Sequence, residues 1–209
     1  MYGSDPKDIF YYLALYNENR ALVDALYDLR REEPWRVPTS ELYLLLRAGL
    51  RYLLVHLLGG VILMVGIVAQ VATTGSLAFA AMTPDSLATA LILIGFLVNA
   101  GAPPLSAWIA DAYPEATPSG TVFLSAFTTK TAVYALLVGF PGAEILVPIG
   151  LYMVFYGIIY ALLENDMRRI LAYSIVNQVG FMVAAIGIGT PMALNGAAAH
   201  AFAHIIYKA

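Results

Sequence analysis

Residues 101–137 have the sequence GAPPLSAWIADAYPEATPSGTVFLSAFTTKTAVYALL, and three features of this stretch are typical of a membrane-spanning chain. It begins with Pro103–Pro104, a pair that cannot continue the hydrogen-bond ladder of a helix. Residues 111–118 are polar and contain two prolines, as turns do. Residues 119–139 are then mostly apolar, and a helix of roughly 20 apolar residues crosses the ~30 Å of hydrocarbon in a bilayer. The stretch therefore predicts a broken helix, a turn and a transmembrane helix.

Similar apolar runs lie on both sides of this stretch. Together they predict five transmembrane helices and the start of a sixth, at residues 52–72, 86–109, 119–139, 145–163, 170–189 and from 193 onward. The second helix is interrupted at Asn99–Pro104, and such breaks are tolerated where the freed backbone groups face protein or a wet cavity. We expect an all-α polytopic membrane protein with about six transmembrane helices, one of them broken at Pro103–Pro104.

The composition supports this fold class. Of the 209 residues 60% are hydrophobic and 12% are charged, whereas a globular domain has about 25% charged residues. Fifteen of the 25 Lys, Arg, Asp and Glu residues lie in residues 1–51. We therefore expect a polar N-terminal segment, residues 1–40, followed by a membrane domain at 41–209. No basic region followed by an apolar run begins the sequence, so no cleavable signal peptide is predicted.

The polar segment carries its own local signals. Residues 21–33 have the pattern of a short amphipathic helix, and Ser40 is a plausible cap for a helix that starts at Glu41. The net charge of −3 gives no basic surface for nucleic acid. Since the chain has no cysteine, disulfides, thiolate chemistry and cysteine-ligated metal sites are excluded.

The arginines predict the orientation in the membrane. If the N-terminal segment is cytoplasmic, the loops at 110–118 and 164–169 lie on the same side. The opposite loops have neither Lys nor Arg. All eight arginines then fall on the side of the N-terminal segment: Arg20, Arg30, Arg31, Arg36, Arg47, Arg51, Arg168 and Arg169. The positive-inside rule therefore predicts a multi-pass protein of a bacterial inner membrane with a cytoplasmic N-terminal segment.

Lys130 is the first candidate functional residue, because an ionisable group within a membrane span costs several kcal/mol unless it is paired or hydrated. It lies about eleven residues, or roughly 16 Å, from the cytoplasmic end of its helix. A lysine side chain reaches only about a third of that distance, so snorkelling to the interface is the less favoured alternative. A buried lysine whose charge responds to its surroundings suits a site that takes up and releases a proton.

A second candidate group is the row His200, His204 and Lys208, at positions i, i+4 and i+8 of the last apolar run. This spacing places the three side chains along one helical face. Two histidines one turn apart can bind zinc, but no third ligand is evident, and no metal or other cofactor is predicted. A lone buried histidine is usually structural, whereas three titratable groups in a row favour a proton or ion relay.

Other polar residues are weaker candidates. Asn99, Asn177 and Gln178, with Thr128–Thr129, could line a hydrated path or form interhelical hydrogen bonds. His56 is either structural or interfacial. Glu115 and Asp111 are expected to be solvated loop acids, although a carboxylate near a helix start is also favoured by the dipole. Asp166 is expected to form a loop ion pair with Arg168 and Arg169.

These motifs resemble a known family. Residues 101–137, the run NDMRRILAYSIVNQVGF at 165–181 and HAFAHIIYKA at 200–209 are similar to the antiporter-like subunits of Mrp-type Na⁺/H⁺ antiporters, respiratory complex I and membrane-bound hydrogenases. The resemblance covers about residues 41–209, and the D-type subunit of the Mrp antiporters is the most similar kind. It implies a fold of two inverted five-helix repeats, each with a broken helix, in which protons pass near mid-membrane along charged residues.

The resemblance assigns roles to individual residues. Lys130 matches the lysine of the eighth family helix, and His200, His204 and Lys208 match the polar row of the eleventh. The break at Asn99–Pro104 matches the discontinuous seventh helix, where the family usually has a lysine and this chain has Asn99. The family's fifth-helix glutamate has no counterpart before Arg47, and a twelfth helix would follow Ala209.

From these departures we expect a partial antiporter-subunit fold that covers roughly the sixth to eleventh family helices. Residues 1–19 instead resemble a stretch of the homodimeric pyruvate dehydrogenase E1 component, which indicates that residues 1–40 are foreign to the membrane domain and that the chain is chimeric or truncated. No decarboxylase activity is expected from so short a match.

The predicted function is transport. The chain is expected to be a fragment of a monovalent cation/proton antiporter subunit, a non-enzymatic translocator that works with other subunits, with protons and with Na⁺ or another monovalent cation in the lipid bilayer. One alternative is the proton-pumping arm of complex I or a hydrogenase. Another is an inert membrane fragment, and a membrane hydrolase is less favoured because neither histidine has a serine or acid pair in a recognisable motif.

Overall fold

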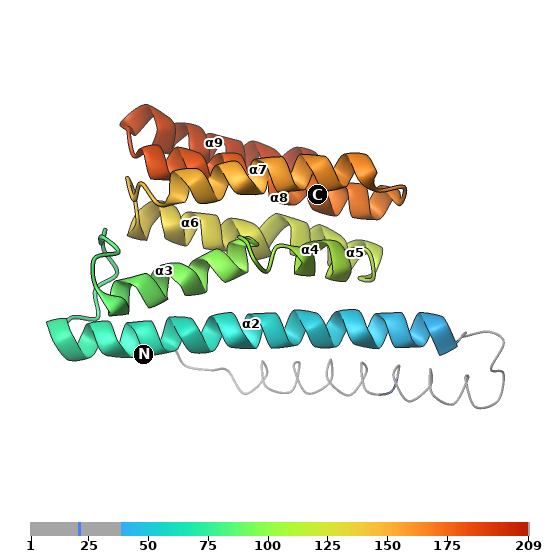
Figure 1. Cartoon of the computed structure of the whole chain (residues 1–209), viewed down its shortest axis with the longest axis horizontal. Helices are drawn as coiled ribbons and strands as arrows, with labels where there is room; N and C mark the ends of the chain where they lie inside the picture. The colour runs from blue at the N-terminus through green and yellow to red at the C-terminus, as the bar shows by residue number, and fades with distance from the viewer. Residues whose placement is uncertain (1–20, 22–38, 209) are drawn as a thin grey trace, which may run out of the picture. The chain divides into compact units, whose positions relative to one another are not determined.

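The structure is a computed structural model that describes Ala21 and residues 39–208 (Figure 1). The chain divides into two compact units, Met1–Arg47 and Ala48–Ala209, and the second contains most of the described residues. The predicted amphipathic helix at 21–33 and the resemblance of residues 1–19 to pyruvate dehydrogenase lie almost entirely outside the described residues. The division of the chain into domains at residues 40 and 41 stays a prediction.

Every regular element of the described residues is a helix, which confirms the predicted fold class (Figure 1). In chain order they are α2 (Thr39–Thr74), α3 (Leu87–Ala100), α4 (Ala107–Ala112), α5 (Pro118–Phe123), the π-helical turn η1 (Leu124–Thr128), α6 (Thr129–Gly139), α7 (Leu146–Leu163), α8 (Met167–Ile188) and α9 (Pro191–Lys208). Among the described residues four helical stretches are long and apolar enough to cross a membrane: Leu46–Thr74, Ser119–Gly139, Leu146–Leu163 and Met167–Ile188. Helix α3 is a shorter apolar helix.

The predicted break in the second apolar run is confirmed. Helix α3 ends at Ala100, Gly101 follows with a φ of +80°, and α4 begins only at Ala107. A left-handed φ is strained for any residue with a Cβ, so glycine suits this position. The carbonyl of Val98 accepts from the backbone N of Gly101 at 3.2 Å and also from the indole Nε1 of Trp108 at 3.2 Å. This carbonyl at the end of α3 is therefore bonded within the protein, as is expected at membrane depth.

The third apolar run is helical throughout but not uniform. The sequence predicts one continuous helix at 119–139, whereas the structure has α5, the π-helical turn η1 and α6 in succession. A π turn closes i→i+5 hydrogen bonds and widens the helix locally. It ends directly before α6, whose second residue is Lys130. Nothing in the apolar pattern of this run had predicted the turn.

Helices α7 and α8 form the most closely packed part of the core. Helix α8 contributes more core residues with no exposed surface than any other helix, among them Val176, Val179 and Met182. Gly157 of α7 lies directly against the backbone of α8: a Cβ built on it would be 2.5 Å from the backbone N of Asn177 and 2.7 Å from the carbonyl oxygen of Tyr173. Close approach over small residues is a common way for membrane helices to associate.

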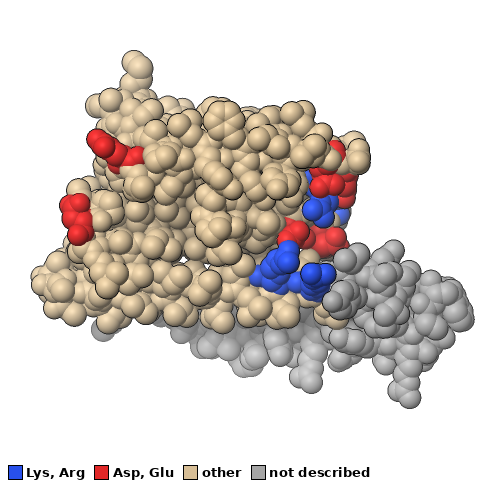
Figure 2. All heavy atoms as spheres, in the orientation of Figure 1, with Lys and Arg blue, Asp and Glu red and all other residues tan. Residues whose placement is uncertain are grey.

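The two ends of this unit differ in charge. Arg51, Arg168 and Arg169 belong to the end that carries the α4–α5 and α7–α8 connections, where Figure 2 shows the Lys and Arg side chains gathered on the visible face. The connections at the other end, residues 75–86 and 140–145, contain Asp85 and Glu144 and neither Lys nor Arg. This asymmetry is the one that the positive-inside rule uses.

Candidate functional site

Lys130 is buried at the junction between η1 and α6. The residue is only 5% exposed, and its Nζ donates a hydrogen bond to the backbone carbonyl of Ser125 at 2.7 Å. The ion pairs found among the described residues join Arg51 to Asp111 and Arg169 to Glu164, so neither involves Lys130. An ammonium group has three N–H donors. One of these donors has a described acceptor, and that acceptor is a neutral carbonyl rather than a carboxylate.

The π-helical turn supplies the carbonyl groups at this site. Ser125, whose carbonyl accepts from Lys130, is the second residue of η1, and the carbonyl of Leu124, the first, accepts from the Tyr113 hydroxyl at 2.9 Å. Burial raises the pKa of the Tyr113 phenol, so the hydroxyl keeps its proton and remains a donor. Two side chains from different helices are therefore held by consecutive carbonyls of one turn.

The predicted row on α9 is present, and each member has a different environment. His200 Nε2 lies 2.8 Å from Gln178 Oε1, and Lys208 Nζ donates to Ser174 Oγ at 2.9 Å. His204, between them, has no exposed surface, and neither of its ring nitrogens has a hydrogen-bond partner among the described residues. The rings of His200 and His204 are 6.3 Å apart between centroids. The row thus consists of two anchored groups and one buried imidazole.

His200 begins a chain of hydrogen bonds that crosses three helices. Gln178 Nε2 donates to Asn177 Oδ1 at 3.1 Å, and Asn177 Nδ2 donates to the Val154 carbonyl of α7 at 2.9 Å. Because a carbonyl can only accept, it fixes the orientation of both amides in turn. Gln178 therefore presents its oxygen to His200. In the neutral form of His200, Nε2 then carries the hydrogen and Nδ1 bears the lone pair.

Ser125, which accepts from Lys130, and Lys208, the last member of the row on α9, line one cavity. Helix α9 contacts α6, η1 and α8. A cavity of about 420 Å³ is lined by Ser125 and by Lys208. It lies at the arginine-bearing end, where Arg168 also lines it and donates to the carbonyl of Ala116 at 2.7 Å. The acceptor of Lys130 and the last member of the row therefore face the same space.

Asn99 and His56 lie in a different cavity. This cavity, of about 290 Å³, is lined by both residues and by Thr128 and Thr131 of the segment that contains Lys130. The Nδ2 of Asn99 donates to the carbonyl of Gly95 at 3.3 Å, within its own helix. Asn99 is thus near the predicted site without a described bond to Lys130.

The predicted acidic residues are at the arginine-bearing end and not beside Lys130. Glu115 is exposed, and Asp111 forms an ion pair with Arg51 of α2. Asp166 accepts from the backbone N of Arg168 at 2.8 Å and caps α8. The loop ion pair expected of Asp166 is instead formed by Glu164, whose Oε2 is 3.0 Å from Arg169 Nε. Asp166 differs from the prediction because its position directly before α8 suits a helix cap.

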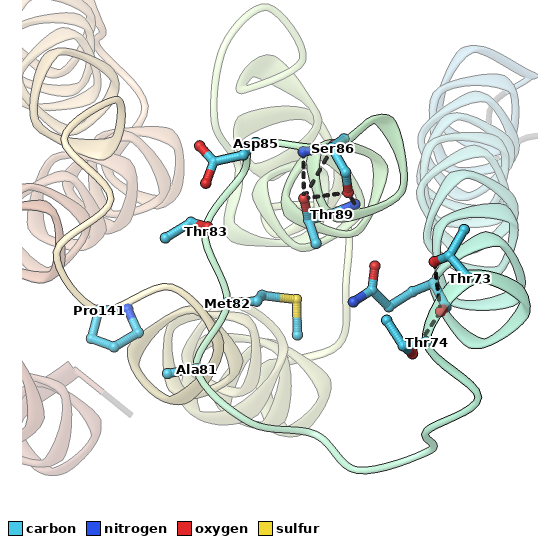
Figure 3. A pocket seen from close by; sticks show the side chains of 10 residues that line it. Thr73, Thr74, Ala81, Met82, Thr83, Asp85, Ser86, Thr89 and Pro141 are labelled. Atoms are coloured by element: carbon cyan, nitrogen blue, oxygen red, sulfur yellow. Dashed lines mark hydrogen bonds between the residues drawn. The ribbon is translucent and has the colours of Figure 1, made fainter.

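A further cavity, of about 540 Å³, lies between the end of α2 and the start of α3 (Figure 3). Its hydroxyl groups serve the helix ends. Thr74 Oγ1 donates to the carbonyl of Gln70 at 2.8 Å, while Ser86 and Thr89 form a reciprocal capping box at the start of α3. These polar residues are explained by local capping, so we assign this cavity no functional role.

Three residues of the site were missed by sequence reasoning: Ser125, Ser174 and Tyr113. Ser125 takes part through its backbone carbonyl, which no side-chain pattern reveals. Ser174 and Tyr113 are polar residues within or beside apolar runs, and the one signal in the sequence was the spacing of Ser174 and Gln178 at i and i+4 on α8. Within the described residues there is no group of three His, Cys, Asp or Glu side chains placed to hold a metal ion.

Comparison with known proteins identifies the family. The profile of the transmembrane NADH:quinone oxidoreductase/Mrp antiporter family matches residues 43–209. The chain belongs to this family. The match includes every helix around Lys130 and α9, and it excludes residues 1–42, so the resemblance of residues 1–19 to pyruvate dehydrogenase stays a prediction.

Relatives within the family come from more than one kind of complex. The chain is 29% identical to the D-type subunit of the Na⁺/H⁺ antiporter from Alkalihalophilus pseudofirmus, over 78% of the chain and 37% of that protein. It is 31% identical to the N-type subunit of NADH-quinone oxidoreductase from Desulforudis audaxviator, over 77% of the chain and 36% of that protein. The solved structure of the Mrp complex from a Dietzia species contains a chain with 27% identity and a TM-score of 0.71, and the match covers 78% of this chain and 33% of that one.

The chain thus spans about a third of the length of the family members that it matches. Within that third, the family and the apolar helices establish a multi-pass membrane protein of the antiporter-subunit type. The partial antiporter-subunit fold expected from the sequence is confirmed.

Proposed function

We propose that this chain carries protons in a monovalent cation/proton antiporter subunit and that Lys130 is the central proton-binding residue. The observation that carries the proposal is the burial of Lys130 with a backbone carbonyl, and no described carboxylate, as its partner. A charge in such a place is costly and marks ion pathways in membrane proteins. The relative from Alkalihalophilus pseudofirmus, which is part of a Na⁺/H⁺ antiporter, supports this choice of transport activity.

The cavity at the arginine-bearing end is the proposed route between Lys130 and that side of the membrane. Ser125 and Lys208 face it, and Arg168 and Thr121 also line it. When Lys130 binds a proton, its ammonium gains donors that can point to this cavity. When it releases the proton, the neutral amine can accept one in turn. The carbonyl of Ser125 holds Nζ in place while the charge changes.

The row on α9 is the proposed relay beyond Lys130. His204 supports this role because its imidazole is buried between His200 and Lys208 and neither nitrogen is committed to a described hydrogen bond. His200 and Lys208 are anchored by Gln178 and Ser174 and fix the two ends of the row. Other subunits of a multi-subunit complex and the lipid bilayer are the proposed partners, in a bacterial inner membrane with the N-terminal segment cytoplasmic.

Transport by variants of the assembled antiporter complex tests the proposal. In everted vesicles the complex carrying this chain is expected to generate a ΔpH on addition of Na⁺, read as dye fluorescence. Lys130→Ala is expected to lower the rate by on the order of 100-fold, as the loss of a proton-transfer group typically does. Tyr134→Phe is the matched control, because Tyr134 lies on the same helix with an exposed side chain. Normal quenching by Lys130→Ala at equal expression would refute the role of Lys130.

A second function is favoured by a specific relative. The 31% identity to the N-type subunit of an NADH-quinone oxidoreductase indicates that the same fold serves a redox-driven assembly as well. In that case ΔpH formation in the same vesicles requires NADH and a quinone, and Na⁺ alone has no effect. The two proton-carrying functions are therefore separated by the driving force that the vesicles need.

A further inference from the structure

The guanidinium of Arg168 is held in place without a carboxylate. Both ion pairs found among the described residues use other arginines. The Nη2 of Arg168 donates instead to two neutral oxygens, the carbonyl of Ala116 at 2.7 Å and Thr121 Oγ1 at 3.2 Å. A guanidinium has five N–H donors, and within the described residues those on Nε and Nη1 have no acceptor. Arg168 is therefore oriented by its surroundings while part of its hydrogen-bonding capacity stays unused.

This guanidinium lies at the wall of the cavity of about 420 Å³. Thr121, one of its two acceptors, lines the cavity, and so do Arg168 itself and Lys208. None of the side chains described around this cavity is an Asp or a Glu. The nearest acids in the sequence are used elsewhere, because Asp166 caps α8 through the backbone N of Arg168 and Glu115 is exposed. The cavity thus has two positive side chains and no described negative one, an arrangement that attracts anions.

The two cations lie at different depths in the membrane domain. Arg168 belongs to the first turn of α8. Lys208 donates to Ser174, which lies about six residues further along the same helix, or roughly 9 Å deeper. An anion at the level of Arg168 is therefore at the end of a membrane span, which is the level of the lipid headgroups. Such an anion leaves the part of the cavity beside Lys208 open, so its binding is compatible with the proposed proton route.

Apolar side chains border the same cavity and favour an amphiphilic ligand. Val122 of α5 and Leu171 of α8 line it, and they are 42% and 47% exposed. Both residues belong to helical stretches that are long and apolar enough to cross a membrane, so lipid can contact their exposed surface. A free phosphate gains nothing from apolar walls, whereas the acyl chains of a phospholipid can cover them. The chemistry of the cavity therefore matches an anionic headgroup with its hydrocarbon attached.

We infer that the mouth of this cavity binds the phosphate group of an anionic phospholipid, with the guanidinium of Arg168 as hydrogen-bond donor and Lys208 as a second, deeper cation. Arginine binds phosphate through parallel N–H···O bonds, so the unused Nε and Nη1 groups suit this ligand. The proposed orientation places the site in the cytoplasmic leaflet, which carries anionic lipids. The choice of an anionic lipid rests on that orientation, whereas the site does not depend on proton transport by Lys130.

Lipid binding by the full chain tests the inference. The chain in detergent is titrated with phosphatidylglycerol or phosphatidylcholine, and bound lipid is counted by native mass spectrometry. We expect one phosphatidylglycerol to bind more tightly than phosphatidylcholine, and Arg168→Gln to weaken it at least about tenfold, because hydrogen bonds to a charged group are lost. Arg51→Gln is the matched control, since it removes the same charge at the same end and Arg51 does not line the cavity. Equal binding of the two lipids, or equal weakening by the two variants, would overturn the inference.

Further arms keep the result decisive. Lys208→Gln leaves both described bonds of Arg168 in place, so it tests the cavity even if Arg168→Gln does not fold. We expect it to weaken phosphatidylglycerol binding about fivefold, and unchanged binding would overturn the inference. Excess inorganic phosphate is expected not to displace the lipid, and displacement would show that the cavity takes a free phosphate instead. If lipid binding behaves as expected while Lys130→Ala keeps normal transport, this site stands and the proposed function fails.

Discussion

The packing of α7 against α8 predicts a large effect from one added methyl group, in the variant Gly157→Ala. The new Cβ would lie 2.5 Å from the backbone N of Asn177, and ordinary contact begins at 3.4 Å, so the two helices must separate by about 0.9 Å. The hydrogen bond from Asn177 Nδ2 to Val154, now 2.9 Å, would then lengthen to about 3.8 Å and break. Overpacking costs about 1–3 kcal/mol. The lost interhelical bond adds about 0.6 kcal/mol. We therefore expect a packing cost of about 2–4 kcal/mol.

The matched control for this variant is Gly60→Ala. Gly60 also lies within a long helix, but a Cβ on it would have no atom within 4 Å. The gain in helix propensity, about 1 kcal/mol, is common to both substitutions, so their difference isolates the packing cost. Reversible unfolding by SDS in mixed micelles, followed by far-UV circular dichroism, gives both free energies. A Gly157→Ala protein as stable as Gly60→Ala would refute the reasoning.

Two further predictions concern polar contacts. Gln178→Leu removes the acceptor of His200 Nε2, so we expect a stability loss of about 0.6–1.7 kcal/mol and a changed ¹⁵N signal for His200. An unchanged signal would show that the side-chain amide of Gln178 does not orient this ring. Asp111→Asn removes the ion pair with Arg51; the side chain of Asp111 is 24% exposed and that of Arg51 is 48% exposed. We therefore expect a loss of stability of at most about 1 kcal/mol, and we expect this loss to disappear at high salt. A larger loss, or one that persists at high salt, would mean that the pair is screened from solvent.

Most of the fold could be predicted from the sequence because each transmembrane helix is a long apolar run. The break at Pro103–Pro104 was predictable for a related reason: two prolines remove two backbone donors whatever surrounds them. The π turn at Leu124–Thr128 was not predictable in the same way. Its residues, LSAFT, contain neither proline nor glycine, and no local signal distinguishes them from those of a regular helix.

The candidate site was predictable in its residues and not in its contacts. An ionisable residue in an apolar run is conspicuous, so Lys130 and the row on α9 were found at once. The partner of Lys130 is the carbonyl of Ser125, which no side-chain pattern reveals. The partner of Lys208 is Ser174 on α8, and it depends on how two helices face one another, which one sequence does not specify. His56 lay near the cytoplasmic end of its predicted helix, and the sequence revealed neither its bond to the Tyr52 carbonyl nor the cavity that it lines.

The π turn before Lys130 also has a consequence for how this region can change during evolution. A turn of this kind holds one residue more than the α-helical turn that it replaces, so deletion of a single residue within 124–128 would restore a regular helix. The helices on either side would keep nearly their present relative orientation, because the wider turn is what absorbs the extra residue. A deletion at 126–128 would place Lys130 four residues after Ser125 instead of five, so its bond to the Ser125 carbonyl is expected to be lost with the wider turn, while the length of the membrane span stays almost unchanged. Substitutions in this segment are therefore expected to be tolerated more readily than any change in its number of residues.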